Sequence, residues 1–120
     1  MDADKLKHAI LAADDLVREP FAAPEWAGTN GDLYLSVMSG GDREWVLNNA
    51  GDAPCFTAKL LSRCFVDGGG RRVFADSDVP VLARKSSIVL ERAAKQALRL
   101  NKMGREHVED EIKNSESAPI

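Results

Sequence analysis

One segment constrains the fold of this chain more than any other: the stretch SSIVLERAAKQALRLNKMG, residues 86–104. Its pattern predicts an amphipathic helix over residues 87–103 that stops at Gly104. The apolar residues follow the i, i+3, i+4, i+7, i+8 spacing of a buried stripe: Leu90, Ala93, Ala94, Ala97 and Leu98. Because alanine is small, this stripe lets another element approach closely, either in the chain's own core or in a partner.

The other side of the same helix is basic. Four cations follow a spacing of three or four residues and form one ridge: Arg92, Lys95, Arg99 and Lys102. Three interpretations remain open: an ordinary solvated face, a nucleic-acid contact, or a ridge that meets an acidic surface on a partner or a second copy. The acidic stretch from Glu106 to Glu111 would be a suitable complement for the third.

Composition sets the remaining limits. A chain of 120 residues with 44% hydrophobic and 29% charged residues is typical of one globular domain, and its net charge of −3 argues against a general nucleic-acid binder. The acidic start excludes a signal or transit peptide, and no apolar run is long enough to cross a bilayer. We therefore expect a soluble cytoplasmic protein, with no membrane partner, in which Cys55 and Cys64 are free thiols; a disulfide is the minority interpretation.

In the first half of the chain, apolar periodicity predicts a helix over residues 4–18 that Pro20 stops. A turn-rich connector, residues 21–32, follows, and we expect Phe21 and Trp26 to anchor it on the core. The alternating segment DLYLSVM predicts a strand around residues 33–37. A helix capped by Ser39 then ends near Asn49, with Asp42 as its third residue near the positive helix end.

In the second half, residues 56–74 predict an antiparallel hairpin with a loose tip at Gly68–Gly70, although residues 56–62 could equally be helical. A short helix follows, with Asp76 or Ser77 as its cap and Pro80 in its first turn. After the long helix we expect a short acidic helix over residues 105–114. The fold class is therefore α+β: a mainly helical single domain, residues 1–114, with a small antiparallel sheet of three short strands and a disordered tail at residues 115–120.

No motif for catalysis or for metal binding is present. The glycine run lacks the lysine and the serine or threonine of a P-loop, and no GxSxG occurs. The two histidines, His8 and His107, lie at opposite ends of the chain without metal-type spacing. We therefore expect a protein that is not an enzyme and that uses no cofactor and no metal.

Three stretches, taken in order, resemble one family: PEWAGTNGDLYLSVMSGGDREWV, AKLLSRCFVDGGGRRVFADSDV and KSSIVLERAAKQALRLNKMG. They give a Pro-x-Trp connector, a strand, a Ser-Gly helix start, a hairpin that ends in Phe-x-Asp, and a basic helix that closes with ALRLN. This order of motifs, over roughly residues 20–114, resembles the tail assembly chaperones of long-tailed bacteriophages, the lambda-like and HK97-like siphovirus type. The ALRLN segment, residues 97–101, is the most characteristic part.

The resemblance implies a non-enzymatic role in phage tail assembly. Members of this family bind the tape measure protein in the cytoplasm of the infected host cell, keep it soluble and help to recruit tail tube subunits. They are absent from the mature virion and form higher multimers, which implies a homo-oligomer. Many are made in two forms by a programmed translational frameshift, and by that analogy this chain is the short form.

A chaperone for a helical client needs an exposed apolar surface. The candidate anchors are aromatic residues and a methionine: Phe21, Trp26, Met38 and Trp45. Each could instead be buried in the chain's own core. The partner-binding prediction comprises Trp26 and Trp45 together with the ridge residues Arg92, Lys95 and Arg99.

Two other functions remain as alternatives. The first is a structural tail completion or head–tail joining protein, which would remain in the virion. The second is a nucleic-acid-binding regulator that acts through the basic ridge, and its binding would weaken steeply with salt.

Overall fold

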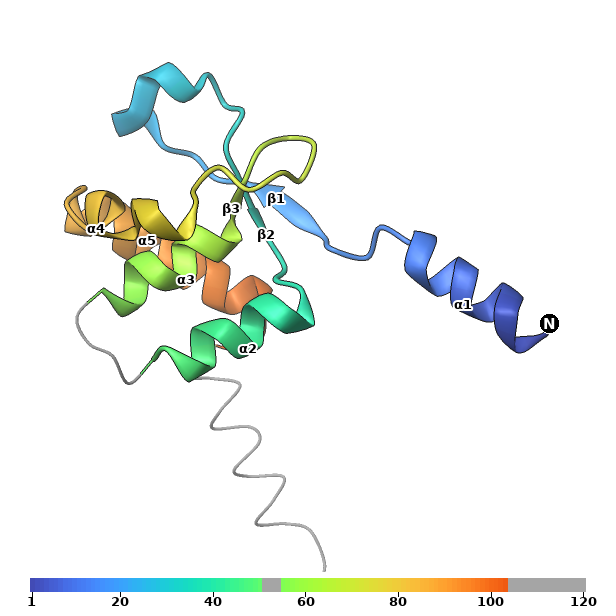
Figure 1. Cartoon of the computed structure of the whole chain (residues 1–120). Helices are drawn as coiled ribbons and strands as arrows, with labels where there is room; N and C mark the ends of the chain where they lie inside the picture. Colours follow the sequence, from blue (N-terminus) through green and yellow to red (C-terminus); the bar gives the residue numbers. More distant parts are fainter. Residues whose placement is uncertain (51–54, 104–120) are drawn as a thin grey trace, which may run out of the picture.

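The structure, a computed structural model, describes residues 1–50 and 55–103 (Figure 1). Within these residues the fold is α+β, as predicted. The helices are α1 (Ala3–Ala12), α2 (Gly40–Asn48), α3 (Phe56–Cys64), α4 (Val79–Leu82) and α5 (Ser87–Leu100), with two 3₁₀ segments, η1 (Pro24–Thr29) and η2 (Asp76–Asp78). The strands are β1 (Arg18–Pro20), β2 (Tyr34–Ser36) and β3 (Phe65–Val66).

The sheet is antiparallel and has the order β1-β2-β3. The central strand β2 places Arg18 opposite Ser36 on one side and pairs Leu35 with Phe65 on the other. Leu35 and Phe65 are fully buried. The predicted strand around residues 33–37 is therefore confirmed and forms the middle of the sheet.

The predicted buried stripe of the long helix is confirmed in α5. Ala93 and Ala97 are completely buried, and α5 packs against both α3 and β2. The small alanine side chains let α3 approach closely, with Leu60 and Leu61 buried on its side of the contact. The core therefore lies between the sheet and these two helices.

The long helix ends earlier than predicted, at Leu100. Lys102 adopts a left-handed φ of 55°, and the Met103 amide donates to the carbonyl of Leu98 at 2.8 Å. This backbone bond closes the last turn in the manner of a Schellman motif, which stops the helix before Gly104. Gly104, the predicted acidic helix at residues 105–114 and the tail at residues 115–120 lie outside the described residues.

Asn101, the last residue of the ALRLN segment, holds this end of α5 to the sheet. Its buried carboxamide accepts a hydrogen bond from the Met38 amide at 2.7 Å and donates to the carbonyls of Ala97 and Ser36 at 2.9 and 3.3 Å. The Arg43 guanidinium donates to its backbone carbonyl at 3.0 Å. One side chain therefore joins α5 to the turn between β2 and α2.

The predicted helix over residues 4–18 is wrong in its second half. α1 ends at Ala12, and residues 18–20 form the edge strand β1. The Val37 amide donates to the carbonyl of Val17 at 2.8 Å, which fixes the start of this strand on the sheet. Apolar periodicity favoured a helix here, but long-range pairing with β2 stabilises the extended conformation, and an edge position tolerates Pro20.

The predicted hairpin is correct only near its tip. Residues 56–64 form α3, the helical alternative, and a strand remains only at Phe65–Val66. Residues 71–74 do return antiparallel, with a bridge between Val66 and Arg72. The tip is not loose, because the Asp67 carboxylate accepts hydrogen bonds from the amides of Gly69 and Arg71, each at 2.9 Å.

Helix caps were predicted with mixed success. Ser39 caps α2 as predicted, since its hydroxyl accepts from the Asp42 amide at 3.1 Å. Neither Asp76 nor Ser77 caps the following short helix. Asp78 stabilises the turn before α4 instead, because its carboxylate accepts a hydrogen bond from the Ala75 amide at 2.8 Å.

Both cysteines are free, as predicted, but they differ in exposure. Burial raises the pKa of the Cys64 thiol to about 12, with a further contribution from the Asp42 charge. At mildly alkaline pH we expect iodoacetamide to modify the half-buried Cys55 in the folded chain and to reach Cys64 only after denaturation. Peptide mass spectrometry would locate the label, and rapid labelling of Cys64 in the folded chain would contradict this expectation.

Candidate partner-binding site

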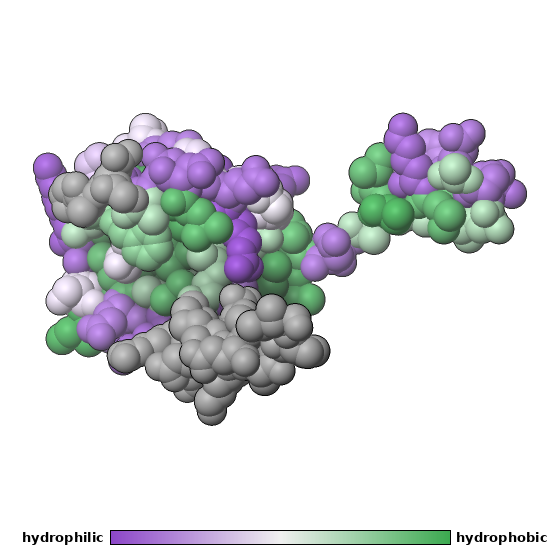
Figure 2. Space-filling model, turned by 90° about the horizontal axis from the view of Figure 1, so that it is seen from below, coloured by the Kyte–Doolittle hydropathy of each residue, from purple (hydrophilic) through white to green (hydrophobic). Residues whose placement is uncertain are grey.

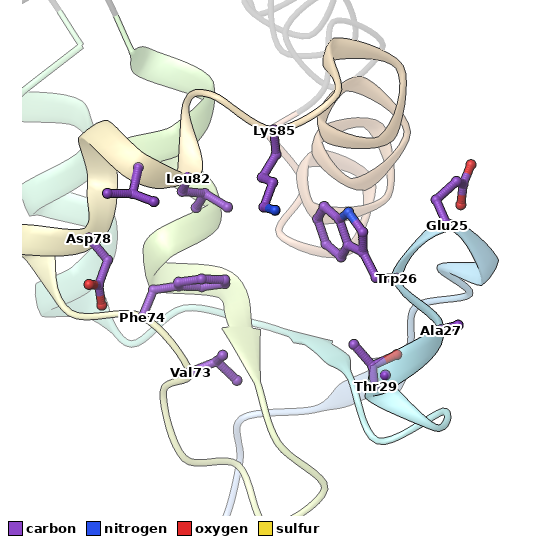
Figure 3. Close-up of a pocket in the computed structure, with 11 residues that line it drawn as sticks. Glu25, Trp26, Ala27, Thr29, Val73, Phe74, Asp78, Leu82 and Lys85 are labelled. Carbon is purple, nitrogen blue, oxygen red and sulfur yellow. The ribbon is translucent and has the colours of Figure 1, made fainter.

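An open hollow of about 700 Å³ lies between η1 and α4, next to the hairpin segment (Figure 3). Its main wall residues are apolar: Trp26 from η1, Phe74 after the hairpin, Val73, Val81 and Leu82. Val81 is 59% exposed and Val73 47%, so apolar side chains face the opening. The hollow therefore offers a concave apolar surface to an external partner.

The aromatic walls rest on one buried ring. The ring of Phe65 lies 6.0 Å from that of Trp26 and 5.8 Å from those of Phe74 and Phe21, in tilted or edge-on arrangements. Such geometries are favourable between aromatic rings. Since Phe65 is completely buried in the core, it fixes the two wall residues Trp26 and Phe74.

Charged groups surround this apolar surface. Glu25, Asp78 and Lys85 contribute to the lining, and Figure 3 shows Glu25 and Asp78 on opposite sides of the hollow. An apolar centre with a charged rim is the arrangement that accepts the apolar face of an amphipathic helix.

Arg92 fixes the η1 wall of the hollow. Its guanidinium makes two hydrogen bonds to the Glu25 carboxylate, at 2.7 and 2.9 Å, and a third to the Ala22 carbonyl at 3.1 Å. This fork geometry is specific to arginine and couples α5 to the connector across 67 residues of sequence. Arg92 therefore supports this wall from α5.

The same contact lowers the pKa of the Glu25 carboxyl. The hydrogen bond from Arg92 is the main reason why the pKa of Glu25 falls from 4.5 to about 2. Because the folded pKa is lowered, the contact stabilises the fold above pH 4.5 and is lost as the pH falls toward about 2. We expect the Glu25 pKa to return toward 4.5 in Arg92→Gln, measured by NMR titration of the side-chain carboxyl. An unchanged pKa in the variant would contradict the assigned cause.

Two of the other predicted ridge residues also have acidic neighbours in the chain, whereas Lys102 lies beyond the end of α5. Arg99 forms an ion pair with Glu19 at 2.7 Å, and Lys95 lies 3.8 Å from Glu91 on the same helix. Intramolecular pairing of this kind reduces the positive potential that a nucleic acid would meet. Contacts of Arg92, Lys95 and Arg99 with a partner remain a prediction.

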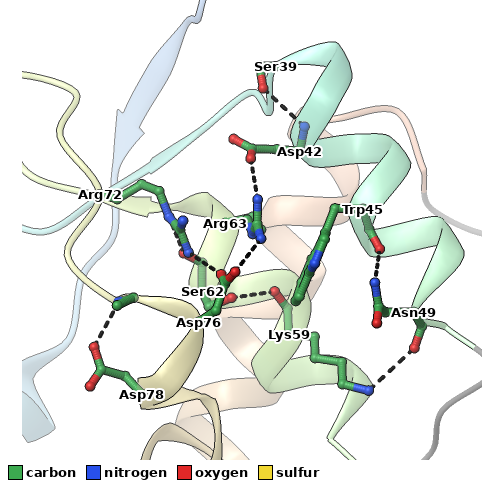
Figure 4. A network of polar contacts seen from close by, with 11 residues as sticks. Ser39, Asp42, Trp45, Asn49, Lys59, Ser62, Arg63, Arg72, Asp76 and Asp78 are labelled. Carbon is green, nitrogen blue, oxygen red and sulfur yellow. Dashed lines mark hydrogen bonds and ion pairs between the residues drawn. The ribbon is translucent and has the colours of Figure 1, made fainter.

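Trp45 lies in a different environment from Trp26. The Arg63 guanidinium stacks 3.9 Å from the centre of its ring and also binds Asp42 at 2.7 Å and Asp76 at 2.8 Å (Figure 4). Arg72 joins the same cluster through Asp76 at 3.0 Å. This network connects α2, α3 and η2, so Trp45 contributes to packing there and does not line the hollow.

The predicted partner-binding residues do not all line this hollow, and their role in binding remains a prediction. Trp26 lines the hollow, Arg92 supports its wall, and Trp45, Lys95 and Arg99 are not among its lining residues. Phe21 and Met38, the other candidate anchors, are buried in the core. Sequence reasoning did not predict Phe74 and Val81 as binding residues. Phe74 is nevertheless the phenylalanine of the Phe-x-Asp motif at the end of the hairpin.

Neither a membrane-spanning helix nor a cluster of metal ligands is present among the described residues. Over residues 1–50 and 55–103, no helix combines the length and apolar character that a membrane crossing requires. In the same part of the chain, no three metal-ligating side chains come together as a candidate metal site.

The fold is similar to that of a phage tail assembly chaperone. The solved structure of the tail assembly chaperone of bacteriophage HK97 matches with a TM-score of 0.61 and covers 82% of this chain and 95% of that chain. The two sequences are 22% identical over the match, so the likeness is one of fold, and at that level it confirms the resemblance found in the sequence. No family model matches the chain, and no curated protein matches its sequence.

Proposed function

We propose that this chain is a non-enzymatic phage tail assembly chaperone. The observation that carries the proposal is the match in fold to the HK97 tail assembly chaperone, which extends over nearly the whole of that protein. The order of sequence motifs that resembles this family, closing with ALRLN, supports it.

We further propose that the client is the tape measure protein and that its helical segments bind in the hollow. The apolar wall of Trp26, Phe74 and Val81 would cover one apolar face of such a helix and keep it from aggregating. The charged rim of Glu25, Asp78 and Lys85 would pair with polar residues at the edges of that face. The wall side chains are already held in place in the free chain. Binding of the client therefore costs little further conformational entropy on this side of the contact.

We propose further features of the assembly role together with this client. The chaperone acts in the host cell cytoplasm, helps to recruit tail tube protein to the bound tape measure protein, and leaves before the virion is mature. It is the short form of a frameshifted pair. Sequencing the reading frame downstream of this chain's coding region would test the last point directly.

Tryptophan fluorescence can measure client binding at the hollow. In a Trp45→Phe background Trp26 is the sole tryptophan, since the chain has two. Titration with amphipathic helical segments of the tape measure protein should change the Trp26 emission and saturate. Val81→Asp places a charge on the apolar wall and should weaken binding at least about tenfold, which corresponds to about 1.4 kcal/mol.

Leu47→Asp is the matched control. Leu47 is 54% exposed on α2 and does not line the hollow, so the same chemical change there should leave the affinity unchanged. Equal weakening by both variants would contradict binding at the hollow. Absence of binding by every segment of the tape measure protein would contradict the proposed client.

A further inference from the structure

Helix α1 has an apolar face that nothing in the described structure covers. None of its side chains is buried, and the helix stands away from the rest of the described chain (Figure 1). Leu6 is 47% exposed and Ile10 70%, one turn apart on the same face. Figure 2 shows apolar side chains gathered along one side of this helix. An exposed apolar stripe on an ordered helix indicates a contact surface.

We propose that α1 docks in the hollow of a second copy of this chain. The hollow has the form that accepts an amphipathic helix, and α1 is an amphipathic helix without a partner in the described residues. Leu6 and Ile10 would insert against the apolar wall formed by Phe74 and Val81.

The charges of the two surfaces are complementary at one position. At 100° per residue, Lys5 and Lys7 lie on either side of Leu6, so a cation borders the apolar stripe on each side. The hollow carries carboxylates on opposite sides, Glu25 and Asp78 (Figure 3). Glu25 stays ionised down to low pH because Arg92 lowers its pKa to about 2. Arg92 already binds both Glu25 oxygens and Lys85 also lines the hollow, so Asp78 is the carboxylate that a lysine of α1 can face across an apolar contact.

The connection to β1 favours a second copy over the chain's own hollow. The Val17 carbonyl is bound to the Val37 amide, and Arg18 donates to the Gly68 carbonyl at 3.2 Å, so the start of β1 is held on the sheet. Only residues 13–16 remain as a connector, and the five Cα–Cα steps from Ala12 to Val17 can span at most about 18 Å. η1, which carries Trp26, follows the opposite end of β1, and Figure 1 shows α1 on the far side of the molecule from it.

Docking of this kind joins two different surfaces: helix α1, here called the arm, and the hollow. Such a heterologous contact repeats from copy to copy and gives a ring if it closes or a filament if it does not. This inference goes beyond the proposed function, since it concerns contacts between copies and holds whatever the client is. A client that binds in the hollow would compete with the arm.

Complementation between two variants tests the inference. The arm variant, Leu6→Asp with Ile10→Asp, keeps the hollow, and the hollow variant, Val81→Asp, keeps the arm. All three positions are exposed, so both variants should fold, which circular dichroism would check. In size-exclusion chromatography with light scattering we expect a multimer for the wild type and the monomer mass of 13.1 kDa for each variant. An equimolar mixture should form a heterodimer of twice that mass and nothing larger.

Leu47→Asp should keep the wild-type mass. The inference is overturned if the wild type is a monomer, if either variant stays as large as the wild type, or if the mixture does not associate. Failure here is distinct from failure of the proposed function, because the arm variant retains the hollow and should still bind the tape measure segment.

Discussion

Replacing Phe65 with alanine is expected to lower the free energy of unfolding by about 3–5 kcal/mol. Phe65 is completely buried, pairs with Leu35 across the sheet, and touches the rings of Phe21, Trp26 and Phe74. Truncation removes the burial of the ring and leaves a cavity beneath the walls of the hollow. A domain of this size is stabilised by only about 5–15 kcal/mol in total, so a large part of its stability would be lost.

Urea unfolding followed by circular dichroism measures this loss. Phe65→Leu is the graded control, because it keeps most of the volume and should cost only about 1 kcal/mol. Trp26 emission, measured in the same variants in a Trp45→Phe background, reports on the wall: the alanine variant should shift it even where the chain is still folded. A loss below about 1 kcal/mol for Phe65→Ala would show that the ring is not the support of the hollow.

Asn101→Ala should cost about 2–4 kcal/mol, the second largest effect. The substitution leaves the buried Met38 amide without its acceptor and removes the donors to the carbonyls of Ala97 and Ser36. An unsatisfied buried polar group costs about 1–3 kcal/mol by itself, and the end of α5 would also lose its attachment to the sheet. The measurement is again the urea midpoint.

Asn48→Ala is the matched control for this substitution. Asn48 is the last residue of α2 and is exposed, so its loss should change stability by no more than about 0.5 kcal/mol. Equal costs at the two positions would contradict the role given to Asn101. Protection of the Met38 amide from hydrogen exchange should fall in Asn101→Ala and stay unchanged in Asn48→Ala.

The parts of the fold that the sequence predicts correctly are those with a long regular pattern. The α5 stripe repeats over four turns, and burial of Ala93 and Ala97 followed from it. β1 has three residues and exists through pairing with β2, which no local pattern records. In α3 the neighbouring residues Leu60 and Leu61 fit a strand or a helix, and only packing against α5 decides between them.

The candidate site was less predictable, because distant segments build it. Trp26 comes from the connector and Val81 from α4, more than 50 residues later, and nothing in either segment indicates that they share a wall. The pairing of Arg92 with Glu25 spans 67 residues, so the basic ridge could not be recognised as a structural support. Trp26 was predicted because aromatic residues are enriched in interfaces.

Co-expression with the tape measure protein of the same genome tests the central claim most directly. The measurement is the amount of tape measure protein in the supernatant after centrifugation, followed by size-exclusion chromatography. The chaperone proposal predicts that the tape measure protein becomes soluble and co-elutes with this chain. A tape measure protein that stays in the pellet, while this chain remains folded in the supernatant, would contradict it.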